Sequence, residues 1–146
     1  MLSKTCEYAI RSVLYVANQQ FINTGMKSGI KQISESLNIP AHFLGKILQT
    51  LTRHEIMSSA KGPNGGFYLN EQQQRNPLLS IVEVIDGLKI FSRCGLGLEK
   101  CSSEHPCPLH NDFASYRDGM ENALRNYTVE DTISGLIKGD VFLTSL

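Results

Sequence analysis

The chain has 146 residues, 41% of them hydrophobic, and a formal net charge of +0 at pH 7. This composition is sufficient for a hydrophobic core, and no apolar run reaches the length of a membrane-spanning helix. Residues 1–75 carry eight Lys and Arg against four Asp and Glu, whereas residues 76–146 carry six against ten. A basic first half is typical of a nucleic-acid-binding module, and an uneven scatter of solvated charge is the alternative.

Residues 3–20 predict a first helix. Ser3 suits the N-cap, Glu7 suits the positive end of the helix dipole, and apolar residues follow at helical spacing (Ile10, Val13, Leu14 and Ala17). The segment lacks the basic start, apolar block and cleavage site of a signal peptide. We therefore expect a cytoplasmic protein without a membrane partner, in which clustered cysteines bind metal or take part in redox chemistry more often than they form disulfides.

The next segment predicts two short helices joined by a tight turn. Ile33 and Leu37 lie on one face of the first, Asn38 suits a turn, and Pro40 suits the start of a second helix that ends near Arg53. The second helix repeats apolar residues on one face (Phe43, Leu44, Ile47, Leu48 and Leu51). This pattern predicts a helix-turn-helix, and a plain helical hairpin with a solvated basic face is the alternative.

A β-hairpin is predicted directly after these helices. Residues 56–60 and 67–69 have the character of strands, and the Gly62–Gly66 segment between them is dense in turn formers. A hairpin in this place makes the motif a winged helix-turn-helix, which we assign to residues 1–76. The residues that we expect to contact base edges or phosphates are Ser28, Pro40, His42, Phe43, Lys46, Gln49, Thr50, Arg53, Lys61, Asn64 and Gly65.

Residues 77–107 predict a connecting helix, with Ser80 and Glu83 as a capping box, and then a loop rich in cysteine. Residues 108–146 predict a long amphipathic helix over 109–127 and a further helix from Thr128, with Asp131 closing a second capping box. The long helix has a narrow apolar seam that suits either a core helix or dimerisation, and a dimer fits the reading of a palindrome. The predicted fold is mainly α with a small β-hairpin wing and a long dimerisation helix.

The loop gathers soft metal donors at the spacing Cys94-x6-Cys101-x5-Cys107-x2-His110. The wide gaps differ from the tight Cys-x2-4-Cys knuckles of structural zinc sites and favour an iron–sulfur cluster. His105 is interpreted as an exposed bystander. Glu7 or Cys6 of a second copy is an alternative source of the fourth donor, although a small buried thiol is the more common role for Cys6.

The residues leave open alternatives to a DNA-binding protein that carries an iron–sulfur cluster. A structural zinc or a thiol–disulfide switch in a winged-helix regulator is one alternative, and a non-regulatory iron–sulfur carrier is another. No phosphate-binding glycine motif, paired carboxylates or Cys/His nucleophile arrangement indicates an enzyme, so neither a catalytic residue nor a small-molecule substrate is predicted.

Over nearly its whole length the chain resembles the Rrf family of winged-helix transcription regulators, which includes IscR and NsrR. The resemblance is carried by "EYAIRSVLYVA", "ISESLNIPAHFLGKILQTL", "SAKGPNGGFYL" and the triple-cysteine loop. It implies a homodimer that binds double-stranded DNA, most often as a repressor, under the control of a 2Fe–2S or 4Fe–4S cluster that can be lost in air.

The resemblance also implies a ligand set. The family's cluster cysteines correspond to Cys94, Cys101 and Cys107. The IscR-like pattern adds His110, whereas the NsrR-like pattern adds an acidic residue of the other subunit at the position of Glu7. Both residues are present here, so both remain candidates for the fourth ligand.

Overall fold

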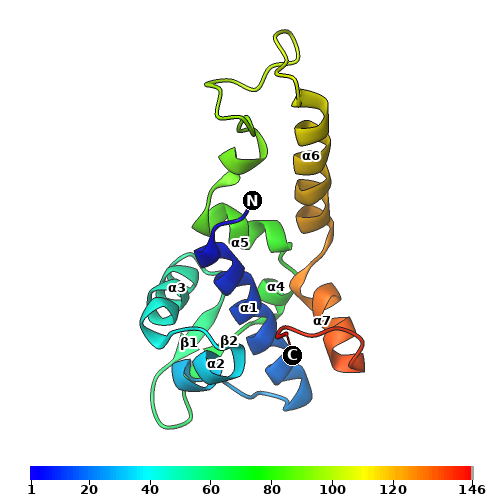
Figure 1. The fold of residues 1–146 in the computed structure, drawn as a ribbon. Helices are drawn as coiled ribbons and strands as arrows, with labels where there is room; N and C mark the ends of the chain where they lie inside the picture. The colour runs from blue at the N-terminus through cyan, green and yellow to red at the C-terminus, as the bar shows by residue number, and fades with distance from the viewer. Residues whose placement is uncertain (146) are drawn as a thin grey trace.

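The computed structural model describes residues 1–145 and is mainly helical, with one small antiparallel hairpin (Figure 1). The predicted fold class, a winged helix-turn-helix with a long additional helix, is confirmed. The elements are α1 (Lys4–Ile22), α2 (Ile30–Leu37), α3 (Ala41–Arg53), β1 (Ser58–Ala60), β2 (Gly66–Tyr68), α4 (Glu71–Gln74), α5 (Leu78–Ile85), the 3-10 helix η1 (Leu88–Phe91), α6 (His110–Asn126) and α7 (Val129–Lys138).

Helix α1 is central to the molecule and packs against α2, α3, α5 and α7 (Figure 1). It begins as the sequence predicts, because the Ser3 hydroxyl accepts a hydrogen bond from the Cys6 backbone N–H at 3.1 Å. Its buried face includes Ala9, Val13 and Val16, all fully buried. The helix therefore forms the support on which the helix-turn-helix rests.

The predicted turn between α2 and α3 is confirmed. Asn38 follows α2 in the left-handed conformation, with φ of 53°, and Pro40 precedes the first residue of α3. Leu44, Leu48 and Leu51 on α3 are completely buried against the core. Because one face of α3 is fixed in this way, the opposite face is held toward solvent.

Strands β1 and β2 pair with Ser58 opposite Tyr68 and Ala60 opposite Gly66. Ser28, from the segment between α1 and α2, adds two further backbone hydrogen bonds to Phe67, of 3.0 and 2.8 Å. Gly66 has a φ of 134°, and a Cβ there would lie 2.9 Å from the Ser28 carbonyl. A glycine at this position therefore lets the hairpin approach the preceding loop closely.

The hydrophobic core extends beyond residue 76, the predicted end of the winged helix-turn-helix. Leu78 and Ile81 of α5 and Val129 and Ile133 of α7 belong to the same buried cluster as α1 and α3. The backbone joins these elements as well, because Leu78 N–H donates to the Tyr127 carbonyl at 2.9 Å. The elements on either side of the cysteine loop and α6 are therefore packed against the helix-turn-helix half.

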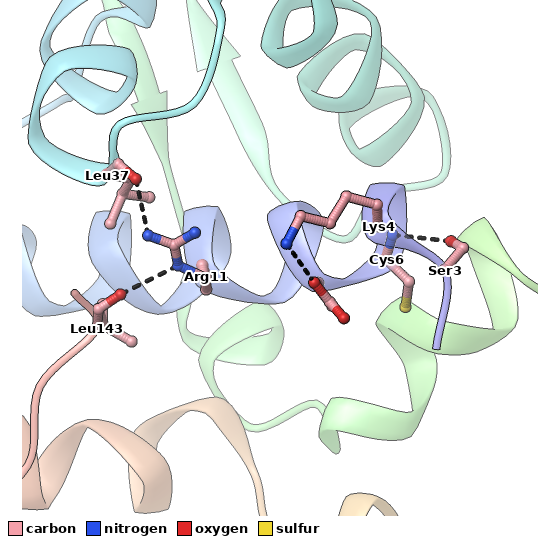
Figure 2. A network of polar contacts seen from close by, with 7 residues as sticks. Ser3, Lys4, Cys6, Arg11, Leu37 and Leu143 are labelled. Atoms are coloured by element: carbon pink, nitrogen blue, oxygen red, sulfur yellow. Dashed lines mark hydrogen bonds and ion pairs between the residues drawn. The ribbon is translucent and has the colours of Figure 1, made fainter. Parts of the chain in front are cut away.

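Arg11 links two other distant segments to α1, as Figure 2 shows. Its guanidinium donates to the carbonyl of Leu37, at the end of α2, at 2.7 Å, and to the carbonyl of Leu143, in the C-terminal segment, at 3.0 Å. The half-buried Arg11 thus joins α1 to the turn after α2 and to the segment after α7.

Of the two predicted capping boxes, the structure confirms one and contradicts the other. The box at Thr128 and Asp131 is confirmed, with reciprocal hydrogen bonds of 3.1 Å. The box at Ser80 is wrong: the N-cap of α5 is Pro77, three residues earlier, because the backbone around Pro77 pairs with Thr128 and fixes the start of the helix. The sequence patterns also did not predict α4 and η1.

Candidate metal centre and nucleic-acid interface

The exposed face of α3 carries most of the predicted DNA contacts. His42, Phe43, Lys46, Gln49 and Arg53 are exposed, and Thr50 is half-buried with its hydroxyl donating to the Lys46 carbonyl at 3.0 Å. Pro40 is also exposed, immediately before the helix. An exposed helix face with polar and basic side chains is the form in which a major groove is read.

The remaining predicted contacts lie in the wing and in the segment before α2, and they differ in solvent exposure. Lys61 and Asn64 are exposed at its tip, and Lys27, which the sequence patterns missed, lies with its ammonium 5.5 Å from the centre of the Tyr68 ring. Gly65 is required sterically, because a Cβ there would lie 2.2 Å from the Ala60 carbonyl oxygen. Ser28 is completely buried, so its position is beneath the hairpin and not on the exposed surface.

The cysteine loop lies at the end of the molecule farthest from the wing, between η1 and the first turn of α6 (Figure 1). Cys94 is buried, whereas Cys101 and Cys107 are half-buried, and all three are free thiols. The backbone N–H groups of Leu96 and Leu98 lower the pKa of the Cys94 thiol, and the Cys107 side chain adds a hydrogen bond to it. The Cys94 thiol therefore loses its proton more readily than an ordinary thiol.

Two of the predicted donors meet at the start of α6. His110 is the first residue of α6, and its Nδ1 lies 3.3 Å from the Cys101 sulfur. The Arg117 Nη2, two turns further along the same helix, donates to the same sulfur at 3.3 Å. The His110 side chain is therefore oriented toward Cys101, although the sequence suggested Cys107, while His105 is exposed.

The loop is held to α6 by close packing. A Cβ at Gly95 would lie 2.4 Å from the Phe113 ring, so only glycine lets the backbone next to Cys94 approach this helix. A cavity of about 390 Å³ adjoins this contact and is lined in part by Cys94, Phe113 and Arg117. The spacing of the cysteines indicated neither Gly95 nor Arg117; the only sequence signal for Arg117 is its place seven residues after His110.

The other two candidate ligands lie on α1. Glu7 is half-buried and pairs with Lys4 at 3.0 Å, a contact drawn in Figure 2. Cys6 is fully buried against α5 and η1, and burial is the main cause that raises the pKa of its thiol to about 12. The predicted structural role of Cys6 fits this environment.

The structure brings two of the predicted donors into direct contact, Cys101 and His110. The Cys107 side chain is a smaller cause of the lowered pKa of Cys94. Among residues 1–145 no three His, Cys, Asp or Glu side chains converge on one point. By its chemistry, three thiols and an imidazole, the donor set fits an iron–sulfur cluster, and zinc accepts the same ligands.

Comparison with known proteins settles the family. The family model Rrf2, described as an iron-dependent transcriptional regulator, matches residues 2–135. The chain belongs to the Rrf2 family. IscR of Sodalis glossinidius, an HTH-type transcriptional regulator, is 25% identical over 134 residues, which are 91% of this chain and 78% of that protein.

Solved structures show the same fold as this Rrf2 protein. CymR, the global cysteine regulator of B. subtilis, has a TM-score of 0.73 at 22% identity over 92% of this chain and 96% of CymR. IscR of T. potens has a TM-score of 0.70 at 16% identity over 97% of this chain and 92% of IscR.

Membership of the Rrf2 family makes the chain a DNA-binding transcriptional regulator and not an enzyme. It also argues against the alternative of a non-regulatory iron–sulfur carrier. Within the described residues, no helix combines the length and the apolar character that crossing a membrane requires.

Proposed function

We propose that this Rrf2 protein is a cytoplasmic repressor that binds palindromic double-stranded DNA as a homodimer and holds an iron–sulfur cluster in its cysteine loop. The observation that carries the proposal is the contact of His110 Nδ1, at the start of α6, with the Cys101 sulfur at 3.3 Å, in a loop that also holds the free thiols of Cys94 and Cys107. When bound, the cluster would supply a group that responds to redox state or nitric oxide.

The three cysteines and one further donor give four protein ligands, the number that a two-iron or a four-iron cluster takes. His110 is favoured as the fourth ligand because its Nδ1 already lies near Cys101. Glu7 of a second copy is the competing ligand. Its carboxylate is accessible at the surface of α1, where its ion-pair partner is the exposed Lys4.

The homodimer is supported by the exposure of α6. None of its 17 residues is buried, and Leu109, Tyr116 and Tyr127 along or beside it are exposed large hydrophobic side chains. A long helix with an uncovered apolar seam gains stability by packing on its copy. Two copies would also present two α3 helices, whose separation must match successive major grooves.

The same helix offers a route from the loop to the DNA-reading helix. α6 begins at His110 and ends where Tyr127 is hydrogen-bonded to Leu78 of α5, which packs against α1 and α3. Release of the loop from its ligand would free the start of α6 and change the spacing of the two α3 helices. A typical coupling of this kind is about 1–3 kcal/mol in operator affinity.

The test is oxygen-free purification followed by an absorption spectrum, iron and sulfide analysis and operator binding. We expect colour and labile sulfide in the wild type and in Cys6→Ala, and their loss in Cys101→Ser. His110→Ala and Glu7→Ala identify the fourth ligand. Equal operator affinity of loaded and cluster-free protein would contradict the proposed switch.

The contribution of the Cys107 side chain to the lowered pKa of Cys94 favours one alternative, a regulator controlled by a thiol–disulfide switch. In that case oxygen-free protein is colourless, and mild oxidation joins these two cysteines and changes operator affinity. Bound zinc without colour or sulfide would indicate a structural metal instead.

A further inference from the structure

Arg117 is the one side chain that the structure attaches to both ends of the first cysteine interval. Its Nη1 donates to the Arg93 carbonyl at 2.5 Å, immediately before Cys94, and its Nη2 donates to the Cys101 sulfur at 3.3 Å. It lies seven residues after His110 on α6, which places both side chains on the same face of the helix. One guanidinium thus joins the loop to α6 at two points.

The hydrogen bonding of Arg117 is incomplete. Its Nε is buried and has no hydrogen-bond partner among the described residues, and no carboxylate among residues 1–145 forms an ion pair with it. An unpaired buried donor and an uncompensated cation are both unfavourable. An anionic acceptor in the adjoining cavity, which Arg117 and Cys94 both line, would remove both penalties.

We propose that Arg117 is the positioning residue of the cofactor site: it clamps the loop to α6 and supplies the positive charge that stabilises the reduced cluster. The inference rests on the proposed function. Three thiolates and a sulfide-bridged iron core carry net negative charge, and reduction adds one electron to it. A cation hydrogen-bonded to a ligand sulfur therefore raises the reduction potential.

An arginine suits this role better than a lysine. The planar guanidinium donates in two fixed directions, so it reaches a carbonyl and a sulfur at once, whereas an ammonium is a single compact charge. Lysine at this position would keep the charge and lose the double attachment. The two parts of the proposal can therefore be separated by substitution.

The experiment compares Arg117→Gln and Arg117→Lys with the matched control Arg125→Gln. Arg125 lies on the same helix, is exposed and pairs only with Glu121. Oxygen-free protein is titrated with dithionite in the presence of redox dyes while the absorption spectrum is followed. Hydrogen exchange of the backbone amides in residues 93–107 is measured on loaded and cluster-free protein.

For Arg117→Gln we expect a fall in reduction potential that corresponds to about a tenfold change in the one-electron equilibrium, about 59 mV, and faster amide exchange in the loop. Arg117→Lys should restore the potential and leave the exchange fast. Arg125→Gln should match the wild type in both. A purely structural Arg117 would change exchange without moving the potential, and would overturn the electrostatic part.

Unchanged potential and unchanged exchange in Arg117→Gln would overturn the whole inference while leaving the cluster proposal standing. Colourless wild-type protein free of labile sulfide would overturn both. The two failures are therefore distinguishable, because the first is seen only in the variant and the second already in the wild type.

Discussion

The two ends of this molecule are stabilised in different ways. The helix-turn-helix and wing rest on a continuous core in which α1, α3, α5 and α7 each contribute buried apolar side chains. The cysteine loop and α6 contain few buried residues: Cys94 in the loop and none in α6. Burial of apolar surface therefore fixes the DNA-reading end, whereas polar contacts and a few close approaches hold the other end.

This difference suits a regulator. An element that responds to a signal needs a low free energy of local opening, and elements with few buried contacts meet that need. The recognition helix must keep its orientation while the loop changes. The boundary lies at Tyr127 and Leu78, where the hydrogen-bonded backbone joins the exposed helix to the core.

Thiol reactivity should show the largest difference between the two ends. Burial raises the pKa of Cys6 to about 12 from an ordinary 9.0, so its thiolate fraction at pH 8 falls about a thousandfold. In reduced, cluster-free protein we expect iodoacetamide to label Cys101 and Cys107 quickly and Cys6 only after unfolding in urea. Peptide mass spectrometry measures the rates. Labelling of native Cys6 at the rate of the loop would show that the core opens as readily as the loop.

Leucine truncation sharpens the comparison in terms of stability. Leu48→Ala removes a fully buried side chain from α3 and should cost about 2–5 kcal/mol of unfolding free energy. Leu98→Ala removes a side chain that is 52% exposed in the cysteine loop and should change stability by less than about 0.5 kcal/mol. Urea unfolding followed by circular dichroism measures both. Similar costs would contradict the division between a packed end and a weakly packed end.

The packed end was also the more predictable end. The 3.6-residue repeat of Leu44, Leu48 and Leu51 predicts both the helix and its buried face, because the burial that the pattern describes is the interaction that stabilises the helix. The turn at Asn38 and the cap at Thr128 are local, so a few adjacent residues specify them. The predicted helix cap at Ser80 is wrong because the pairing of Pro77 with Thr128, far away in the sequence, determines where α5 starts.

The cysteine loop was predictable only in its composition. Its donors are evident from residue type, but the contact of His110 with Cys101 and the contacts of Arg117 and Gly95 depend on how α6 returns past the loop. Such contacts follow from tertiary structure and leave no periodic pattern. The burial of Ser28 is of the same kind, because it results from the bridge to Phe67.

The salt dependence of DNA binding tests whether the exposed face of α3 contacts DNA phosphates. Lys46→Gln should lower affinity for a selected operator and for a random duplex alike, and should reduce the slope of log K against log salt by about 1. Lys138→Gln, an exposed lysine in the last turn of α7, serves as the control and should leave the slope unchanged. Fluorescence anisotropy over a range of salt concentrations measures both. Equal slopes for the two variants would show that Lys46 does not contact DNA phosphates.

The smallest expected effect concerns the capping box where α6 meets α7. Hydrogen bonds from the Thr128 side chain and backbone lower the pKa of Asp131 below its ordinary 3.8. A carboxylate with a depressed pKa contributes stability that is present above the ordinary pKa and is lost as pH falls through the folded value. Asp131→Asn, which keeps an acceptor and removes the charge, should therefore lower the urea midpoint slightly at pH 7, and this difference should shrink toward pH 3. Glu130→Gln removes a neighbouring charge without touching the box and controls for the general effect of the helix dipole. If Asp131→Asn lowers the urea midpoint equally at both pH values, the capping box stabilises the junction between α6 and α7 through its hydrogen bonds and not through the charge of Asp131.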